Sequence, residues 1–184
     1  LPVVVFLPGV LGSHLVFKNS NERVWLNPPT LITGGIKDIR WKQQGIEAEK
    51  PFSMFYGDFC AHLLATHRVV PFAYDWRRPL NEIGRQFAEQ IEELLENTDQ
   101  PVRIVAHSMG GLVVRALLVQ NGELWGRLME RDGARFMMLG TPNQGSHQMV
   151  ETLLGKSANI RNLARVDLAH DLQEILNIVA ELPG

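Results

Sequence analysis

Hydrophobic positions along the chain form short runs that alternate with longer periodic segments. Short, mostly apolar runs predict strands at residues 1–7, 67–74, 102–106 and 135–139, and the first, which is continuous, predicts a strand that is buried on both faces. Pro71 interrupts the second run, which predicts that a strand ends or bulges there. Between residues 80 and 97 apolar residues recur three and four apart, which predicts an amphipathic helix.

The remaining helical segments differ in how apolar they are. Residues 109–120 are almost all apolar and predict a buried helix, with Asn121-Gly122 as its stop signal. Residues 146–155 and 159–182 are also predicted to be helical, whereas 18–55 show no sustained period and predict a long irregular excursion. Strands that alternate with helices favour a parallel sheet with right-handed crossovers, and hence an α/β fold.

Composition narrows the class of protein. The chain has 184 residues, which suits one domain, and 45% hydrophobic with 21% charged residues excludes a disordered chain. A formal net charge of −2 gives no reason to expect a nucleic-acid partner. No apolar run approaches the roughly 20 residues that span a bilayer. One cysteine excludes an internal disulfide, and neither the compartment nor the oligomeric state follows from the sequence.

The sharpest chemical signal is the segment Ala106-His107-Ser108-Met109-Gly110, which joins a predicted strand to a predicted buried helix. This is the nucleophile-elbow pattern G-x-S-x-G with Ala106 at its first position. Small residues two before and two after the serine are needed because the turn brings those positions close together. We therefore predict Ser108 as a nucleophile, with the Met109 amide at the helix N-terminus aimed at a developing oxyanion. His107 is interpreted as a pocket-wall residue.

A glycine-rich loop follows the first predicted strand, in the segment Pro8-Gly-Val-Leu-Gly12. Gly9 allows close backbone approach, and the amide of the next residue, Val10, is predicted to be the second oxyanion donor. The G-x-G-x-x-G and G-x-x-x-x-G-K-[ST] patterns are absent, so a dinucleotide or P-loop domain is excluded. The predicted chemistry uses no metal and no cofactor.

Two further loops follow strands and are expected at the same edge of the sheet. Asp75 and Arg77 come after the second strand, and their charges are predicted to support the site by bracing neighbouring loops rather than by contacting substrate. Residues 140–146 follow the fourth strand and are predicted to form a pocket wall.

Four segments in order, Pro2 to Ser13, Pro71 to Arg77, Ala106 to Gly111 and Gly140 to Gly145, resemble the α/β-hydrolase fold. More narrowly, they resemble the lecithin:cholesterol acyltransferase-like lipases and acyltransferases. The resemblance implies Ser108 as nucleophile, the amides of Val10 and Met109 as the oxyanion hole, and acyl transfer from a lipid-like ester to water or an alcohol. Residues 18–55 and 156–184 match little.

The catalytic acid and histidine are not evident from the sequence. In this fold they follow the serine on later strands, and neither His147 nor His170 follows such a strand. The chain begins at Leu1 inside an apolar run, so we expect a fragment with the C-terminal part of the fold truncated, inactive by itself. We predict a front part of a hydrolase core over 1–155 and the start of a helical cap over 156–184.

Two alternatives remain open at this point. The chain is either part of a serine hydrolase or acyltransferase, or a non-catalytic hydrolase-fold module used for binding. Residues 156–182 form either a mobile cap near Ser108 or the next crossover helix on a face of the sheet. Phe52, Phe55, Tyr56 and Phe59 are candidates either for an apolar acyl site or for the core.

Overall fold

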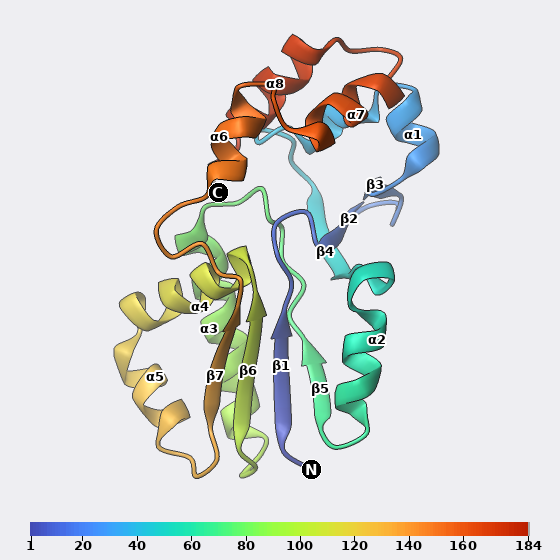
Figure 1. Cartoon of the computed structure of the whole chain (residues 1–184). Helices are drawn as coiled ribbons and strands as arrows, with labels where there is room; N and C mark the ends of the chain where they lie inside the picture. The colour runs from blue at the N-terminus through green and yellow to red at the C-terminus, as the bar shows by residue number, and fades with distance from the viewer. Residues whose placement is uncertain (184) are drawn as a thin grey trace.

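A computed structural model describes residues 1–183. Four parallel strands form the central sheet in the order β5-β1-β6-β7 (Figure 1). Their bounds are β1 Val3–Leu7, β5 Arg68–Pro71, β6 Val102–His107 and β7 Arg135–Leu139. The four predicted strands are therefore confirmed, and β5 ends at Pro71, as the proline predicted, although the Phe72 N–H still donates to the Phe6 carbonyl of β1 at 2.8 Å.

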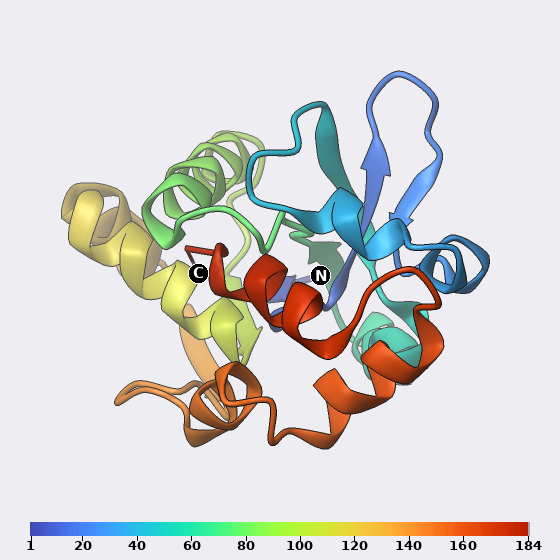
Figure 2. The same cartoon turned by 90° about the horizontal axis from the view of Figure 1, so that it is seen from above.

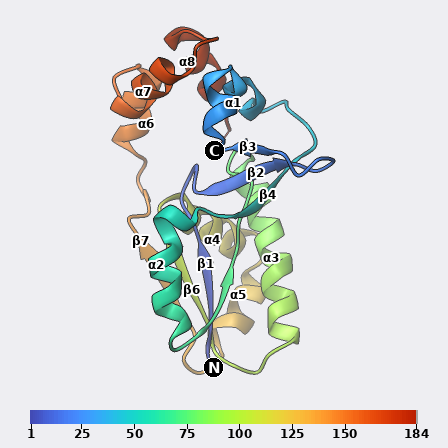
Figure 3. The same cartoon turned by 90° about the vertical axis from the view of Figure 1, so that its right-hand side faces the viewer.

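Helices cover both faces of this sheet, as expected for an α/β-hydrolase. Helix α2 (Ser53–Leu64) lies on one face, and α3 (Leu80–Glu96), α4 (Met109–Gln120) and α5 (Gly122–Met129) lie on the other (Figure 3). Helix α3 is amphipathic as predicted, because Ile83, Phe87 and Ile91 are all fully buried. The predicted fold class, a mostly parallel sheet with helices on both faces, is confirmed.

A second, three-stranded antiparallel sheet occupies much of the segment predicted to be irregular. Its order is β3-β2-β4, with β2 Ser13–Phe17, β3 Arg23–Trp25 and β4 Ile46–Pro51. Helix α1 (Pro28–Ile32) and the 3-10 helix η1 (Gly35–Ile39) lie between β3 and β4. The prediction for residues 18–55 was correct in that each element is short, but it missed the sheet, because β3 has only three residues and β2 pairs with β4 across a long connection.

Three other differences concern helices. Helix α2 was missed because its apolar residues do not form a single stripe. The stop signal at Asn121-Gly122 is confirmed, because α4 ends at Gln120, but the next helix, α5, was not predicted: Asn121 caps it by accepting the Leu124 N–H at 3.0 Å. The predicted helix over 159–182 is two helices, α7 (Ala158–Val166) and α8 (Leu172–Ala180). The break between them is a turn in which buried Asp167 accepts backbone N–H groups.

The last three helices, α6 (His147–Leu153), α7 and α8, lie beyond the carboxyl ends of the strands rather than on a face of the sheet (Figures 1 and 2). They pack against the α1–η1 segment. The Leu168 N–H donates to the Ile32 carbonyl at 3.1 Å, and a Cβ placed on Gly34 would lie 2.7 Å from Ala169 Cβ. The mobile cap and the division of the chain at residue 155 remain predictions.

Strand β7 is an outer strand of the central sheet and is poorly covered. Met137, Met138 and Leu139 are 55%, 42% and 37% exposed, although all three are apolar. Strands β1 and β6, in contrast, lie inside the sheet and are largely buried. The loops that follow β1 and β6 therefore begin at the two inner strands of the sheet.

Candidate active site

Ser108 lies at a strained turn between β6 and α4. Its φ of +50° and ψ of −122° fall outside the conformations that residues with a side chain readily adopt. Its backbone N–H donates to the Leu139 carbonyl of β7 at 2.8 Å, which ties the turn to the neighbouring strand. Ser108 is half-buried, and among residues 1–183 its hydroxyl has no hydrogen-bond partner.

Close backbone contacts explain why glycines flank this turn. A Cβ on Gly110 would lie 2.7 Å from the Pro8 carbonyl oxygen and 2.9 Å from Leu7 Cβ. A Cβ on Gly9 would lie 3.1 Å from Ser108 Cβ, so the loop after β1 sits directly against the Ser108 turn. Ala106 is fully buried within β6, where its single methyl group is accommodated.

The loop after β1 is a tight turn in which the amides of Val10 and Leu11 have no acceptor within residues 1–183. The Gly12 N–H donates to the Gly9 carbonyl at 3.0 Å, and Leu11 has a φ of +60°, the pattern of a type II turn. Within residues 1–183 the N–H groups of Val10 and of Met109, the first residue of α4, have no protein acceptor. Both amides predicted as oxyanion donors are therefore available to a ligand.

Two tyrosine hydroxyls hold the peptide group between Pro8 and Gly9. Tyr74 donates to the Pro8 carbonyl at 2.7 Å, and Tyr56 accepts the Gly9 N–H at 3.0 Å. The Tyr56 hydroxyl also lies 3.0 Å from His107 Nδ1. Burial raises the pKa of both phenols, so both remain protonated at neutral pH. Neither tyrosine was identified as a support residue from the sequence, because each contact spans tens of residues.

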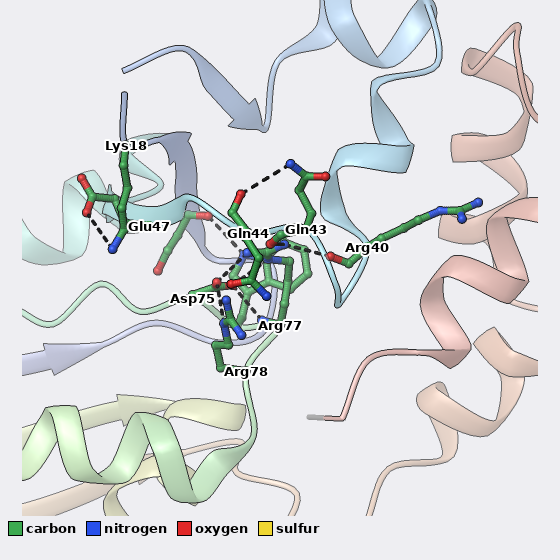
Figure 4. A network of polar contacts seen from close by, with 10 residues as sticks. Lys18, Arg40, Gln43, Gln44, Glu47, Asp75, Arg77 and Arg78 are labelled. Atoms are coloured by element: carbon green, nitrogen blue, oxygen red, sulfur yellow. Dashed lines mark hydrogen bonds and ion pairs between the residues drawn. The ribbon is translucent and has the colours of Figure 1, made fainter. Parts of the chain in front are cut away.

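Asp75 and Arg77 form a buried ion pair (Figure 4). The contact is bidentate: Arg77 Nε lies 2.8 Å from Asp75 Oδ1 and the terminal nitrogen 2.7 Å from Oδ2. The other terminal nitrogen of Arg77 donates to the Arg40 carbonyl at 3.0 Å. The pair thus links the loop after β5 to the segment that precedes β4, and the Arg77 side chain is fully buried.

The loop after β7 packs on α4. A Cβ on Gly111 would lie 2.0 Å from Thr141 Oγ1, and Arg115 donates to the Asn143 side-chain oxygen at 2.8 Å. Gly140 and Gly145 adopt φ values of +63° and +92°, which suit glycine. This loop therefore leads the chain from the sheet into α6 along the side of α4, the helix that follows Ser108.

The structure gives neither His147 nor His170 a contact with Ser108. His147 begins α6 and lines a polar hollow with Glu151 and Lys156, and Ser108 is not part of that hollow. His170 Nδ1 lies 3.0 Å from Asp167 Oδ2, in the turn between α7 and α8. Burial opposes the charge of Asp167, but hydrogen bonds from Ala169 and His170 hold its pKa below the usual value. The location of the acid and histidine outside this chain stays a prediction.

No group of three or more His, Cys, Asp or Glu side chains within residues 1–183 is arranged to hold a metal ion. The helices in the same range are too short or too polar to cross a bilayer.

Comparison with known proteins was made for sequence and for structure. The family model of lecithin:cholesterol acyltransferase matches residues 62–182, well over half of the chain, and so includes the stretch 156–182, for which little match was expected. Lysosomal phospholipase A and acyltransferase is 34% identical in Mus musculus and 35% identical in Homo sapiens, in each case over 89 residues. Those residues are 47% of this chain and 21% of each relative, so the matched segment spans about a fifth of the curated relatives.

Among solved structures, a chain in the crystal structure of the Tle4-Tli4 complex superposes with a TM-score of 0.64. The superposition covers 98% of this chain and 53% of that chain, at 16% sequence identity. This likeness supports the α/β-hydrolase fold, while the family follows from the sequence match. The chain belongs to the lecithin:cholesterol acyltransferase family.

Proposed function

We propose that this chain supplies the nucleophile and the oxyanion hole of a serine hydrolase or acyltransferase that acts on lipid-like esters. Ser108 is the nucleophile, and the backbone N–H groups of Val10 and Met109 bind the oxyanion. The observation that carries the proposal is the strained backbone of Ser108, at φ +50°, beside two backbone amides that have no protein acceptor. Strain of this kind costs about 1–3 kcal/mol and is retained mainly at functional sites.

The reaction follows from the chemistry of a serine nucleophile. Ser108 Oγ forms a bond to the ester carbonyl carbon and loses its proton to a general base, and the carbonyl oxygen becomes an oxyanion. Collapse of that intermediate breaks the ester C–O bond, and the alcohol leaves with a proton while the acyl group stays on Ser108. Water or a second alcohol then takes the acyl group by the same steps in reverse. The names of the relatives, phospholipase A and acyltransferase, are consistent with both acceptors.

The helix that begins at Met109 adds to the stabilisation of the oxyanion. Its N-terminus carries a partial positive charge, and the Met109 N–H is the first amide of that helix. Preorganised donors of this type contribute most when charge develops in the transition state. We therefore expect both amides to affect turnover more than substrate binding.

Apolar side chains near this site are candidates for the acyl-chain surface. Phe52 is buried, whereas Phe55 is 71% exposed and Met54 is 88% exposed on the first turn of α2. The Phe52 N–H donates to the Gly12 carbonyl at 2.9 Å, which places this turn beside the oxyanion loop. Exposed apolar groups in this position suit a substrate with a hydrocarbon chain.

The direct test is fluorophosphonate labelling and ester turnover of the natural protein with Ser108→Ala. Ser20→Ala, a change at an exposed serine in the turn between β2 and β3, is the matched control. We expect Ser108→Ala to abolish labelling and to leave less than about a thousandth of wild-type turnover, because binding and the oxyanion hole alone supply little rate. Thermal unfolding should stay close to wild type, because the hydroxyl makes no hydrogen bond to another residue in the described range.

The alternative function is a non-catalytic binding module with a hydrolase fold. A natural protein that is folded but does not label at Ser108 favours this alternative. Turnover of Ser108→Ala above about a tenth of wild type contradicts the acyl-enzyme mechanism, since loss of a triad member normally removes far more.

A further inference from the structure

We infer that Tyr56 is a positioning residue that fixes the orientation of the oxyanion donor Val10. This inference rests on the proposed function, because it concerns the same reaction at Ser108. Tyr56 comes from α2, far along the chain from both the loop after β1 and the Ser108 turn. Its hydroxyl is the only side-chain group, among residues 1–183, that bonds to both segments.

The first step of the argument concerns the peptide group before the donor. The carbonyl of the Pro8–Gly9 peptide accepts the Tyr74 hydroxyl at 2.7 Å, and its N–H donates to the Tyr56 hydroxyl at 3.0 Å. Both polar ends of this peptide group are therefore bound, so its plane is fixed. Tyr56 and Tyr74 are the only tyrosines in the chain, and the hydroxyl groups of both form hydrogen bonds with this one peptide group.

The second step concerns the donor itself. Val10 N–H belongs to the next peptide group, between Gly9 and Val10, whose carbonyl accepts the Gly12 N–H at 3.0 Å. In a trans peptide the N–H and the carbonyl point in opposite directions, so this bond aims the Val10 N–H away from Gly12. Gly9 joins the two peptide groups and has no Cβ to restrict rotation. The bond from Tyr56 is therefore needed to limit rotation at Gly9.

The third step concerns the contact with the Ser108 turn. The Tyr56 oxygen accepts the Gly9 N–H, which leaves its hydrogen available for His107 Nδ1 at 3.0 Å. His107 immediately precedes Ser108 in the chain. The same hydroxyl thus sets the spacing between the loop that carries one donor and the turn that carries the nucleophile. A displacement of about 1 Å in such geometry costs about 100-fold in rate.

The ring of Tyr56 has a separate structural role. It packs on Phe6 of β1, with ring centroids 4.9 Å apart. Tyr56→Phe keeps this packing and removes only the hydroxyl. The substitution removes two hydrogen bonds, with the Gly9 N–H and with His107 Nδ1, but the ring still packs on Phe6, so the variant is expected to fold. His62→Gln, on the exposed side of the same helix, is the matched control.

The experiment measures kcat and KM for a soluble short-chain ester in the natural protein, with active sites counted by end-point fluorophosphonate labelling. We expect Tyr56→Phe to lower kcat per labelled site by about 10- to 100-fold. KM should change by less than about threefold, because oxyanion contacts form mainly in the transition state. A residue with only a structural role would reduce the number of labelled sites without changing kcat per site.

A double variant tests whether Tyr56 acts through the donor. In a Val10→Pro background, where the donor N–H is absent, Tyr56→Phe should lower kcat by less than about twofold more. Two outcomes overturn the inference: kcat per site in Tyr56→Phe equal to that in His62→Gln, or effects that multiply in the double variant. Failure of the proposed function is a different result, in which wild-type protein does not label at Ser108 at all.

Discussion

Replacing Val10 with proline removes a predicted oxyanion donor without removing the turn that presents it. Val10 occupies the second position of the turn from Gly9 to Gly12, where Leu11, the third residue, has a φ of +60°. In a type II turn the second position has a φ near −60°, which proline adopts by its ring. The Val10 N–H has no protein acceptor within residues 1–183, so proline breaks no internal hydrogen bond.

The expected magnitude follows from the loss of one of two donors. Removing one oxyanion-hole donor costs about 2.7–4 kcal/mol of transition-state stabilisation, or about 100- to 1,000-fold in kcat. Folding should not suffer, because proline at a compatible position stabilises a protein by about 0.4–1 kcal/mol through the unfolded chain. Val10→Ala keeps the amide and measures what the side chain, which is 41% exposed, contributes by itself.

The assay is steady-state hydrolysis of a short-chain ester, with thermal unfolding recorded on the same preparations. The reasoning predicts that Val10→Pro loses turnover while its melting temperature stays at or above that of wild type, and that Val10→Ala loses less than about tenfold. A folded Val10→Pro protein with more than about a third of wild-type kcat would refute the assignment of this amide as a donor. Equal losses in both variants would assign the effect to the side chain instead.

Three further predictions concern the support of the site. If the last helices form a mobile cap, amides of 160–180 exchange hydrogen well before those of 102–106, and equal protection in a mass-spectrometric exchange experiment contradicts the cap. Arg77→Leu leaves the buried Asp75 carboxylate without its main partner and should lower the free energy of unfolding, measured by urea titration, by about 3–5 kcal/mol. Arg78→Leu is the control: Arg78 contacts Asp75 at a longer distance and is more exposed, so its loss should cost about 1 kcal/mol or less. The pKa of Asp167 is lowered on folding, so the stability that its charge contributes is present above the unfolded pKa of about 4 and is lost as the pH falls through the lower folded pKa. In thermal melts at acid pH the wild-type protein should lose this stability, and Asp167→Asn should not. Identical pH dependence of the two melting temperatures would be evidence against this role of Asp167.

The central sheet was predictable because each of its strands is a local signal. Runs of apolar residues bounded by Pro, Gly and polar residues marked β1, β6 and β7, and the spacing within α3 marked its buried side. The position of the turn at Ser108 was also predictable, because a strand, small residues and an apolar helix follow one another directly. The catalytic role of Ser108, Val10 and Met109 remains a prediction.

The antiparallel sheet and the tyrosine contacts were not predictable by the same reasoning. Strand β2 pairs with β4 about 30 residues away, and the segment between them shows no sustained hydrophobic period. Tyr56 contacts Gly9 and His107 across 47 and 51 residues, and its neighbours in the sequence give no sign of either partner. Asp75 and Arg77 were accessible to sequence reasoning because opposite charges two residues apart can meet within one loop.

The contact between the α1–η1 segment and the turn after α7 also determines when this part of the protein can form during synthesis. The Ile32 carbonyl accepts a hydrogen bond from the Leu168 N–H, and Gly34 packs against Ala169. About 140 residues separate the two sides, so at typical translation rates the early segment waits about 10–30 s for the late one. During that interval the face of α1 and η1 that later meets the turn remains uncovered, although β1, β5 and β6 are already available for pairing. The layer above the site is therefore expected to assemble on the ribosome after β1, β5 and β6 have paired, and to depend on chaperones in the interval.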